Sequence, residues 1–240
     1  MPAKFDPPIY LNSSNNNNEV IVFGKSPEQE AEDIQNGVAR LGGAWRQPSY
    51  AKAYLRAARV LIRDAQEKQD LDQLAMPIFY LQRHSLELFI KGFLGSLYDI
   101  ARMRFDLQQS VQTKKDLPSK NAVKRLTMSH DLQKLNSDLR EISVQLQIEG
   151  YPNALPQLIK DIETHENNPT WSRYPCSGVD GINHHLKAEV VLPLVDLHQR
   201  LEKIIQDAAF DVDQGTETLE ASIYYEMNSL LQSLDAKIPD

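Results

Sequence analysis

The longest helical pattern in the sequence runs from about residue 71 to residue 104, and it limits what the chain can fold into. Apolar side chains cover most of its circumference: Met76, Phe79, Tyr80, Leu86, Phe89, Ile90, Phe93, Leu94 and Leu97. A helix that is apolar nearly all round packs against neighbours on several sides. We therefore expect a long central helix that is the most buried element of the fold.

The other periodic segments are also helical, and strand signals are almost absent apart from "EVIVF" at 19–23. Proline, glycine and capping residues divide the rest of the chain into further helices, expected at 26–42, 49–68, 130–146, 153–165, 186–212 and 216–235. Ser129 is expected to cap the helix that follows it, and the basic segment around Pro118 to form a loop. The sequence predicts an all-α fold, an antiparallel helical bundle with short connections. Residues 1–25 form an N-terminal extension, and residues 26–240 form a single helical domain.

Charged residues recur every fourth position within the long helix, at Arg83, Glu87 and Lys91. One interpretation is a solvated stripe, in which neighbouring opposite charges contribute about 0.2–0.5 kcal/mol per pair. The other is a polar site inside the bundle, where every buried charge must find a partner because an unpaired one costs several kcal/mol.

Two short segments could supply such partners. In "SHDLQKL" His130 stands at the beginning of a helix, where backbone N–H groups favour anions. In "TWSRYP" Arg173 and Tyr174 lie between an aromatic residue and a proline, and a fixed arginine suits a carboxylate or phosphate. We expect Glu87 to be buried and bonded to a cation or to His130, with Arg173 close by.

Composition argues against several classes of protein. The 240 residues carry a net charge of −7, so the surface as a whole is no general binder of nucleic acid or membranes. A single cysteine, the lack of a signal-peptide pattern and the lack of a long apolar run predict a cytoplasmic protein that does not contact the membrane. Cys176, His184 and His185 match no standard zinc spacing, so we expect no metal and no other cofactor.

Three motifs in order carry a resemblance to a known family. "RHSLELFIKGFL" on the long helix, then "SHDLQKL", then "SRYP" followed by Asp180-Gly181, resembles bacterial members of the HEPN superfamily over about residues 50–210. The resemblance implies an all-α domain that often forms a homodimer. Many such proteins are metal-independent endoribonucleases of toxin and phage-defence systems, with RNA as the partner. Others are inactive binding modules.

The resemblance also implies roles for particular residues. Active members carry an arginine, four to six residues, and then a histidine, and Arg125 and His130 match that spacing. His130 would be the acid or base, and Arg125 would hold the phosphate. Glu87 would orient a cation as the third catalytic residue. The remaining candidates would bind the substrate: Arg83, Lys91, Arg173 and Tyr174.

A second function stays open from the sequence. The chain could be a non-catalytic helical module that binds a partner protein or a nucleotide, with its polar residues tying the fold together. The acidic C-terminal helix "TLEASIYYEMNSLLQSL" carries an apolar stripe that either docks on its own bundle or binds a partner protein.

Overall fold

The computed structural model describes residues 11–12, 21–22, 27–39, 50–107, 117–166, 176–177, 183–184, 189–209 and 218–236. The chain divides into two compact units, residues 1–49 and residues 50–240. Helix α1 therefore belongs to the first unit, whereas the sequence analysis placed residues 26–240 in one domain.

The described residues of the first unit form one short helix and one strand pair. Strands β1 (Leu11–Asn12) and β2 (Ile21–Val22) run antiparallel. Helix α1 (Pro27–Gln35) begins with proline in its first turn, as expected, but ends seven residues before the glycines at 42 and 43. Gly37 has φ +64°, and Val38 N–H donates to the Asp33 carbonyl at 2.7 Å. The Asn36-Gly37 pair ends the helix because glycine readily adopts this left-handed conformation.

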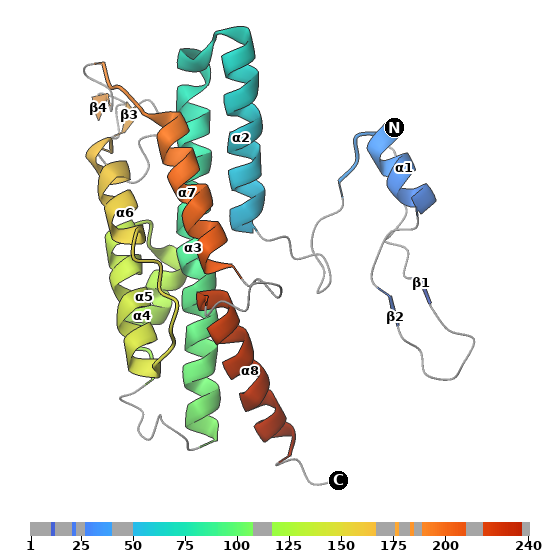
Figure 1. Cartoon of the computed structure of the whole chain (residues 1–240), viewed down its shortest axis with the longest axis vertical. Coiled ribbons are helices and arrows are strands. Elements are labelled where there is room, and N and C mark those ends of the chain that lie inside the picture. The colour runs from blue at the N-terminus through green and yellow to red at the C-terminus, as the bar shows by residue number, and fades with distance from the viewer. Residues whose placement is uncertain are drawn as a thin grey trace. The chain divides into compact units, whose positions relative to one another are not determined.

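The second unit is helical, which confirms the all-α prediction (Figure 1). Its helices are α2 (Tyr50–Lys68), α3 (Leu71–Asp106), α4 (Lys120–Met128), α5 (Leu132–Leu146), α6 (Leu155–Thr164), α7 (Leu194–Ala208) and α8 (Leu219–Asp235). Strands β3 (Cys176–Ser177) and β4 (Asn183–His184) form an antiparallel pair between α6 and α7.

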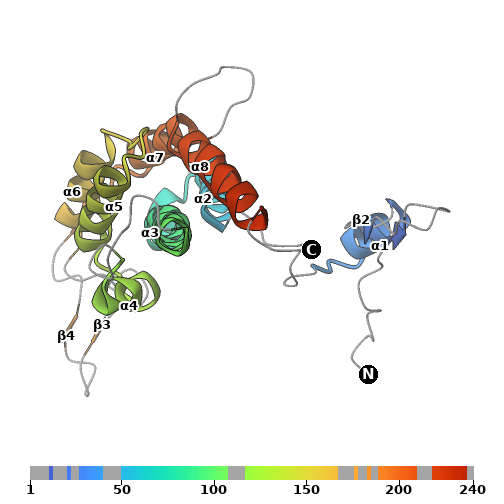
Figure 2. The same ribbon diagram turned by 90° about the horizontal axis from the view of Figure 1, so that it is seen from below.

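Helix α3 is the axis of this unit. It has 36 residues, which at about 1.5 Å per residue makes it roughly 54 Å long. Helices α2, α4, α5, α7 and α8 all pack against it, and Figure 2 looks nearly along it. Ile78, Leu86, Ile90, Leu94 and Leu97 are completely buried, as the apolar circumference of this segment predicted. The observed bounds extend the predicted 71–104 by two residues.

Helix α4 was not expected, because its sequence was interpreted as a basic loop. Ser119 acts as its N-cap, and the Ser119 side chain accepts a hydrogen bond from the Ala122 N–H at 3.1 Å. Pro118 directly precedes this cap, so the proline that indicated a loop marks the entry to a helix instead.

The C-terminal helix α8 docks on its own bundle through one face. Leu219, Ile223 and Leu230 are buried, and Arg104 of α3 donates to Glu226 at 2.7 Å and to the Leu146 carbonyl at 2.8 Å. The beginning of α8 lies against the turn between α5 and α6 at Gly150, which has φ +86°. A Cβ atom at Gly150 would lie 2.2 Å from the Leu219 backbone nitrogen, so no other residue fits there without movement.

None of the helices in the described segments combines the length and the apolar composition that a membrane-spanning helix needs.

Candidate functional site

The three charged residues at every fourth position of α3, namely Arg83, Glu87 and Lys91, lie inside the bundle, and we call them the charge ladder. The exposed fraction of the side chain is 3% for Arg83, 2% for Glu87 and 15% for Lys91. Arg83 Nη1 donates to Glu87 Oε2 at 3.0 Å, and Lys91 Nζ donates to Glu87 Oε1 at 2.8 Å. A solvated stripe is therefore excluded, and the ladder is buried and internally paired.

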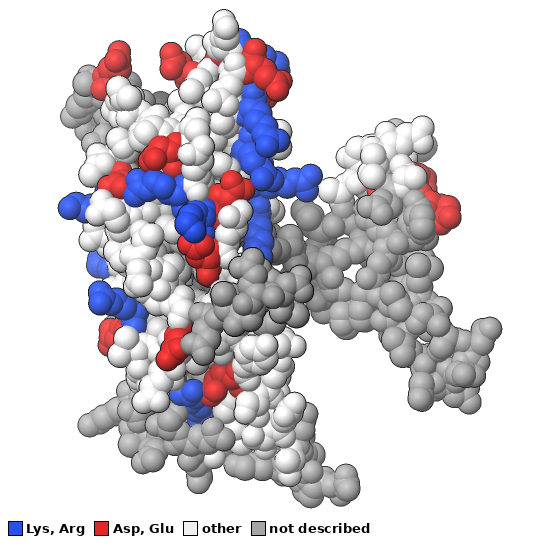
Figure 3. Space-filling model, viewed as in Figure 1, with Lys and Arg blue, Asp and Glu red and all other residues white. Residues whose placement is uncertain are grey.

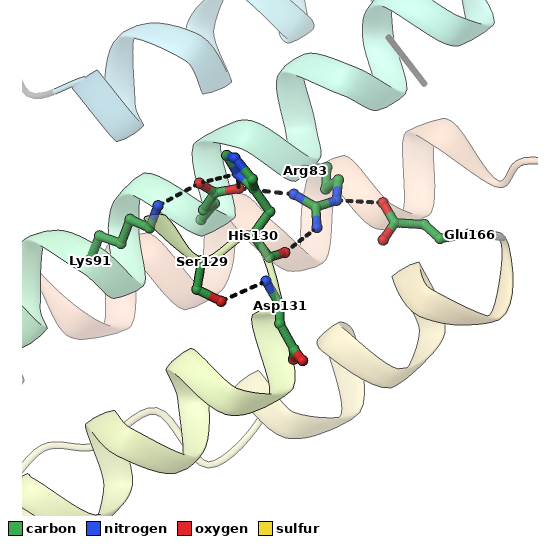
Figure 4. A network of polar contacts seen from close by, with 7 residues as sticks. Arg83, Lys91, Ser129, His130, Asp131 and Glu166 are labelled. Atoms are coloured by element: carbon green, nitrogen blue, oxygen red, sulfur yellow. Dashed lines mark hydrogen bonds and ion pairs between the residues drawn. The ribbon is translucent and has the colours of Figure 1, made fainter. Parts of the chain in front are cut away.

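His130 joins this ladder from the connection between α4 and α5 (Figure 4). Its Nδ1 lies 3.0 Å from Glu87 Oε1 and 3.1 Å from Oε2. Its backbone carbonyl accepts from Arg83 Nη2 at 2.6 Å, so backbone and side chain are both held by α3. The predicted bond between Glu87 and His130 is confirmed.

The capping pattern around His130 differs from the sequence-based prediction. Asp131, not Ser129, caps α5, because the Asp131 side chain accepts from the Lys134 N–H at 2.9 Å. Ser129 Oγ instead accepts from the Asp131 N–H at 3.1 Å and lies at the end of α4. Two consecutive turns therefore fix the residue between them, and His130 enters the site with little conformational freedom.

Electrostatics determine which nitrogen of His130 carries the proton. Burial by itself raises the pKa of Glu87, but the hydrogen bonds from Lys91 and His130 outweigh it, and the net pKa is lowered. Glu87 is thus a carboxylate that only accepts hydrogen bonds. Nδ1 of His130 must donate, which leaves Nε2 as the free nitrogen of the neutral ring. The His130 side chain is 39% exposed, and Nε2 has no hydrogen-bond partner among the described residues.

Glu166, just beyond α6, completes the network and was missed in the sequence. Its Oε1 lies 2.5 Å from Arg83 Nε, and its side chain is 5% exposed. Burial raises the pKa of Glu166 to about 7, and the attraction of Arg83 offsets only part of that effect. The only available signal was indirect: a buried arginine has five donors to satisfy, and Glu87 can accept few of them. We call Arg83, Glu87, Lys91, His130 and Glu166 the α3 network.

Arg125 is positioned elsewhere. Its Nε and Nη2 donate to the two carboxylate oxygens of Asp138 on α5, each at 2.7 Å. This bidentate pair joins α4 to α5, and no contact links Arg125 to His130 among the described residues. Arg125 also borders a hollow of about 380 Å³, lined by Asn121, Lys124, Arg125, Met128 and Ser129.

Two further residues were predicted to bind substrate. Arg173 and Tyr174 lie outside the described residues, so their predicted substrate-binding roles and the expected proximity of Arg173 to Glu87 stay predictions. Among the residues that the structure describes, no group of histidine, cysteine, aspartate and glutamate side chains is arranged to hold a metal ion.

The site thus combines a buried, charge-paired scaffold with one partly exposed and oriented imidazole. Comparisons of this chain with protein-family models, with curated proteins and with solved structures found no match.

Proposed function

We propose that this chain is a HEPN-like, metal-independent endoribonuclease of a bacterial defence or toxin system. The observation that carries the proposal is the Glu87–His130 pair, in which a buried carboxylate holds Nδ1 and directs Nε2 away from itself. A carboxylate that orients a histidine and stabilises its protonated form is a recurrent arrangement for general acid–base catalysis.

In the proposed reaction, His130 Nε2 takes the proton of an RNA 2′-hydroxyl. The 2′-oxygen then attacks the adjacent phosphorus, and the bond from phosphorus to the 5′-oxygen breaks. The leaving 5′-oxygen takes a proton from water, and a 2′,3′-cyclic phosphate remains. The hydroxide left from that water takes the proton from Nε2 of the His130 imidazolium, which restores the neutral base. Glu87 stabilises the imidazolium that forms, and Lys91 keeps Glu87 ionised.

Positive charge for the phosphate comes from α4 in this proposal. Lys124 and Arg125 border the hollow of about 380 Å³, which ends one residue before His130 at Ser129. Asp138 holds the Arg125 guanidinium in one orientation, and a preorganised cation stabilises developing phosphate charge most effectively. Arg83 and Glu166 act as positioning residues, since both are buried behind Glu87.

We also propose that the protein acts as a homodimer, as the HEPN resemblance implies. Large apolar side chains that remain exposed on α8, namely Tyr224, Tyr225 and Leu231, provide a surface for a second copy or for another protein partner. Light scattering at micromolar concentration tests this, and a mass of 27.3 kDa would contradict it.

A specific observation favours the second candidate function, a non-catalytic helical module that binds a partner protein or nucleotide. Each charge of the α3 network already has an opposite charge within the bundle, and Arg125 is paired with Asp138. Charges that satisfy one another in this way also serve to fix a fold.

The substitution His130→Asn separates the two candidates. The asparagine amide can still donate to Glu87, so the fold should keep its stability, while the base is lost. We expect cleavage of a labelled mixed-sequence RNA by the wild type in the presence of EDTA, with a cyclic phosphate product, and no cleavage by the variant. His165→Asn, at the end of α6, is the matched control and should cleave normally. A wild type that leaves the RNA intact, or equal cleavage by His130→Asn, would refute the nuclease proposal.

A further inference from the structure

Helix α2 carries a line of positive charge that the α3 network does not use. Lys52, Arg56, Arg59 and Arg63 follow one another at intervals of four, three and four residues, and we call them the α2 stripe. At 3.6 residues per turn, these positions fall within an arc of about 60° on one side of the helix. Figure 3 shows a continuous column of basic side chains along the part of the bundle where Figure 1 places α2.

The stripe is open to a ligand along most of its length. Lys52, Arg56 and Arg63 are exposed, and none of them forms an ion pair with a described residue. Arg59 donates to Glu202 of α7 at 3.0 Å and is the only member held within the fold. Two acids lie on the same helix near the end of the stripe. Asp64 is bonded to Lys68, and Glu67 follows Arg63 by four residues but forms no ion pair with it.

The shape of the stripe restricts the kinds of ligand that could bind to it. It is about 16 Å long, from eleven residues at about 1.5 Å each, and one side chain wide. Anionic membranes favour a broad basic face with apolar side chains for insertion. A linear polyanion, whose charges follow one another along a strand, fits a narrow stripe about 16 Å long better.

The side-chain chemistry of the stripe suits an anion that offers paired oxygens, and the linear spacing of its charges fits a phosphate backbone. Three of the four cations are arginines, whose planar guanidinium groups bind phosphate oxygens in pairs. The rest of the chain is acidic enough to give a net charge of −7, so a polyanion is repelled elsewhere and drawn to this line. We propose that the α2 stripe binds the phosphate backbone of an RNA strand independently of sequence. The choice of RNA rests on the proposed function, whereas the phosphate contacts do not.

The binding test uses the full chain and a labelled mixed-sequence single-stranded RNA, followed by fluorescence anisotropy over a range of salt concentrations. The triple substitution Lys52→Gln, Arg56→Gln and Arg63→Gln should weaken binding by about tenfold or more. It should also reduce the slope of log K against log salt by about 2, because each phosphate contact on a single strand contributes about 0.7.

A matched control removes the same charge from other exposed positions, with Lys68→Gln, Lys160→Gln and Lys203→Gln. Its affinity and salt slope should stay close to those of the wild type. Equal weakening by both triple variants would overturn the proposal, because net charge alone would then explain binding. Displacement of RNA by polyglutamate at equal charge, or binding to anionic vesicles as tight as to RNA, would assign the stripe to another partner and also overturn it.

His130→Asn distinguishes this inference from the proposed function. We expect that variant to bind RNA with wild-type affinity while failing to cleave it. If the wild type binds RNA through the stripe but does not cleave it, the nuclease proposal fails and the α2 stripe stands. If cleavage depends on His130 while the stripe variant binds like its control, the α2 stripe fails and the nuclease proposal stands.

Discussion

Helices α2 and α3 lie side by side, and both place charged residues three or four positions apart. On α3 the signs alternate, since Glu87 stands between Arg83 and Lys91, and the ladder is buried. On α2 the signs are the same: Lys52, Arg56 and Arg63 stay exposed, and Arg59 pairs with Glu202 of α7. Alternating charges one turn apart can neutralise one another within a single helix, so water can be removed from them. Like charges cannot, and they remain in water or meet an external partner.

The largest change in stability is expected for the buried charges of α3. Glu87→Gln should lower the free energy of unfolding by about 3–5 kcal/mol, because Arg83 and Lys91 would lose the carboxylate between them. Urea unfolding measures the change, with Glu67→Gln on the exposed surface of α2 as the control. Equal midpoints for the two variants would show that the ladder contributes no more than a surface stripe.

Glu166 provides the next largest effect, and it depends on pH. Because its pKa is raised from 4.5 to about 7, the folded protein keeps a proton that the unfolded chain releases between these values. Stability from this group is complete below pH 4.5 and declines as pH rises towards 7. Glu166→Gln, which imitates the protonated acid, should be more stable than the wild type by about 3 kcal/mol above pH 7.

The pH profile of unfolding checks this, and the two proteins should converge below pH 4.5. A variant that is destabilised at every pH would show that Glu166 acts mainly as the ionised partner of Arg83.

His198 on α7 tests a buried polar group that lacks the pairing of the α3 network. Its side chain is 5% exposed, and neither ring nitrogen has a hydrogen-bond partner among the described residues. Burial lowers the pKa of His198, with the nearby Glu202 opposing the effect, so the folded state resists protonation. Stability from this group is complete above pH 6.5 and falls as the pH drops below that value.

His198→Leu should raise stability by about 1 kcal/mol at neutral pH, because it removes a buried polar group without a hydrogen-bond partner among the described residues. It should also remove the acid sensitivity below pH 6.5. Thermal unfolding across that range measures it, and His165→Leu at the end of α6 should leave the acid sensitivity unchanged.

The smallest effect belongs to the α2 stripe. Arg56→Gln and Arg63→Gln should each change the free energy of unfolding by less than about 0.5 kcal/mol, because neither guanidinium is bonded within the described fold. The same urea titration applies. A loss of stability comparable to that of Glu87→Gln would show that the charges of α2 are bonded within the fold as those of α3 are.

The sequence predicted those parts of the fold that depend on local periodicity. The long apolar helix and the pairing of Glu87 both followed from spacing along one helix, since residues four apart must be neighbours. Helix α4 was missed because Pro118 is compatible with a loop as well as with a helix entry, and only the capping geometry of Ser119 distinguishes them.

The rest of the site depends on contacts between distant segments. Glu166 lies 83 positions from Arg83 and carries no periodic signal of its own. The pairing of Arg125 with Asp138 depends on how α4 folds back along α5, whereas the family resemblance implied that Arg125 acts together with His130. Tertiary packing, which no local pattern encodes, decided these positions.

The close approach at Gly150 has a consequence for the order in which this protein folds. The backbone of Leu219 occupies the space where a side chain at position 150 would begin. We therefore expect helix α8 to dock after the chain between α5 and α6 has adopted its left-handed turn, so that docking of the C-terminus depends on a structure formed some seventy residues earlier. The amide protons of α8 should then exchange with solvent together with those of that turn, as one cooperative unit that opens before the α2–α3 hairpin.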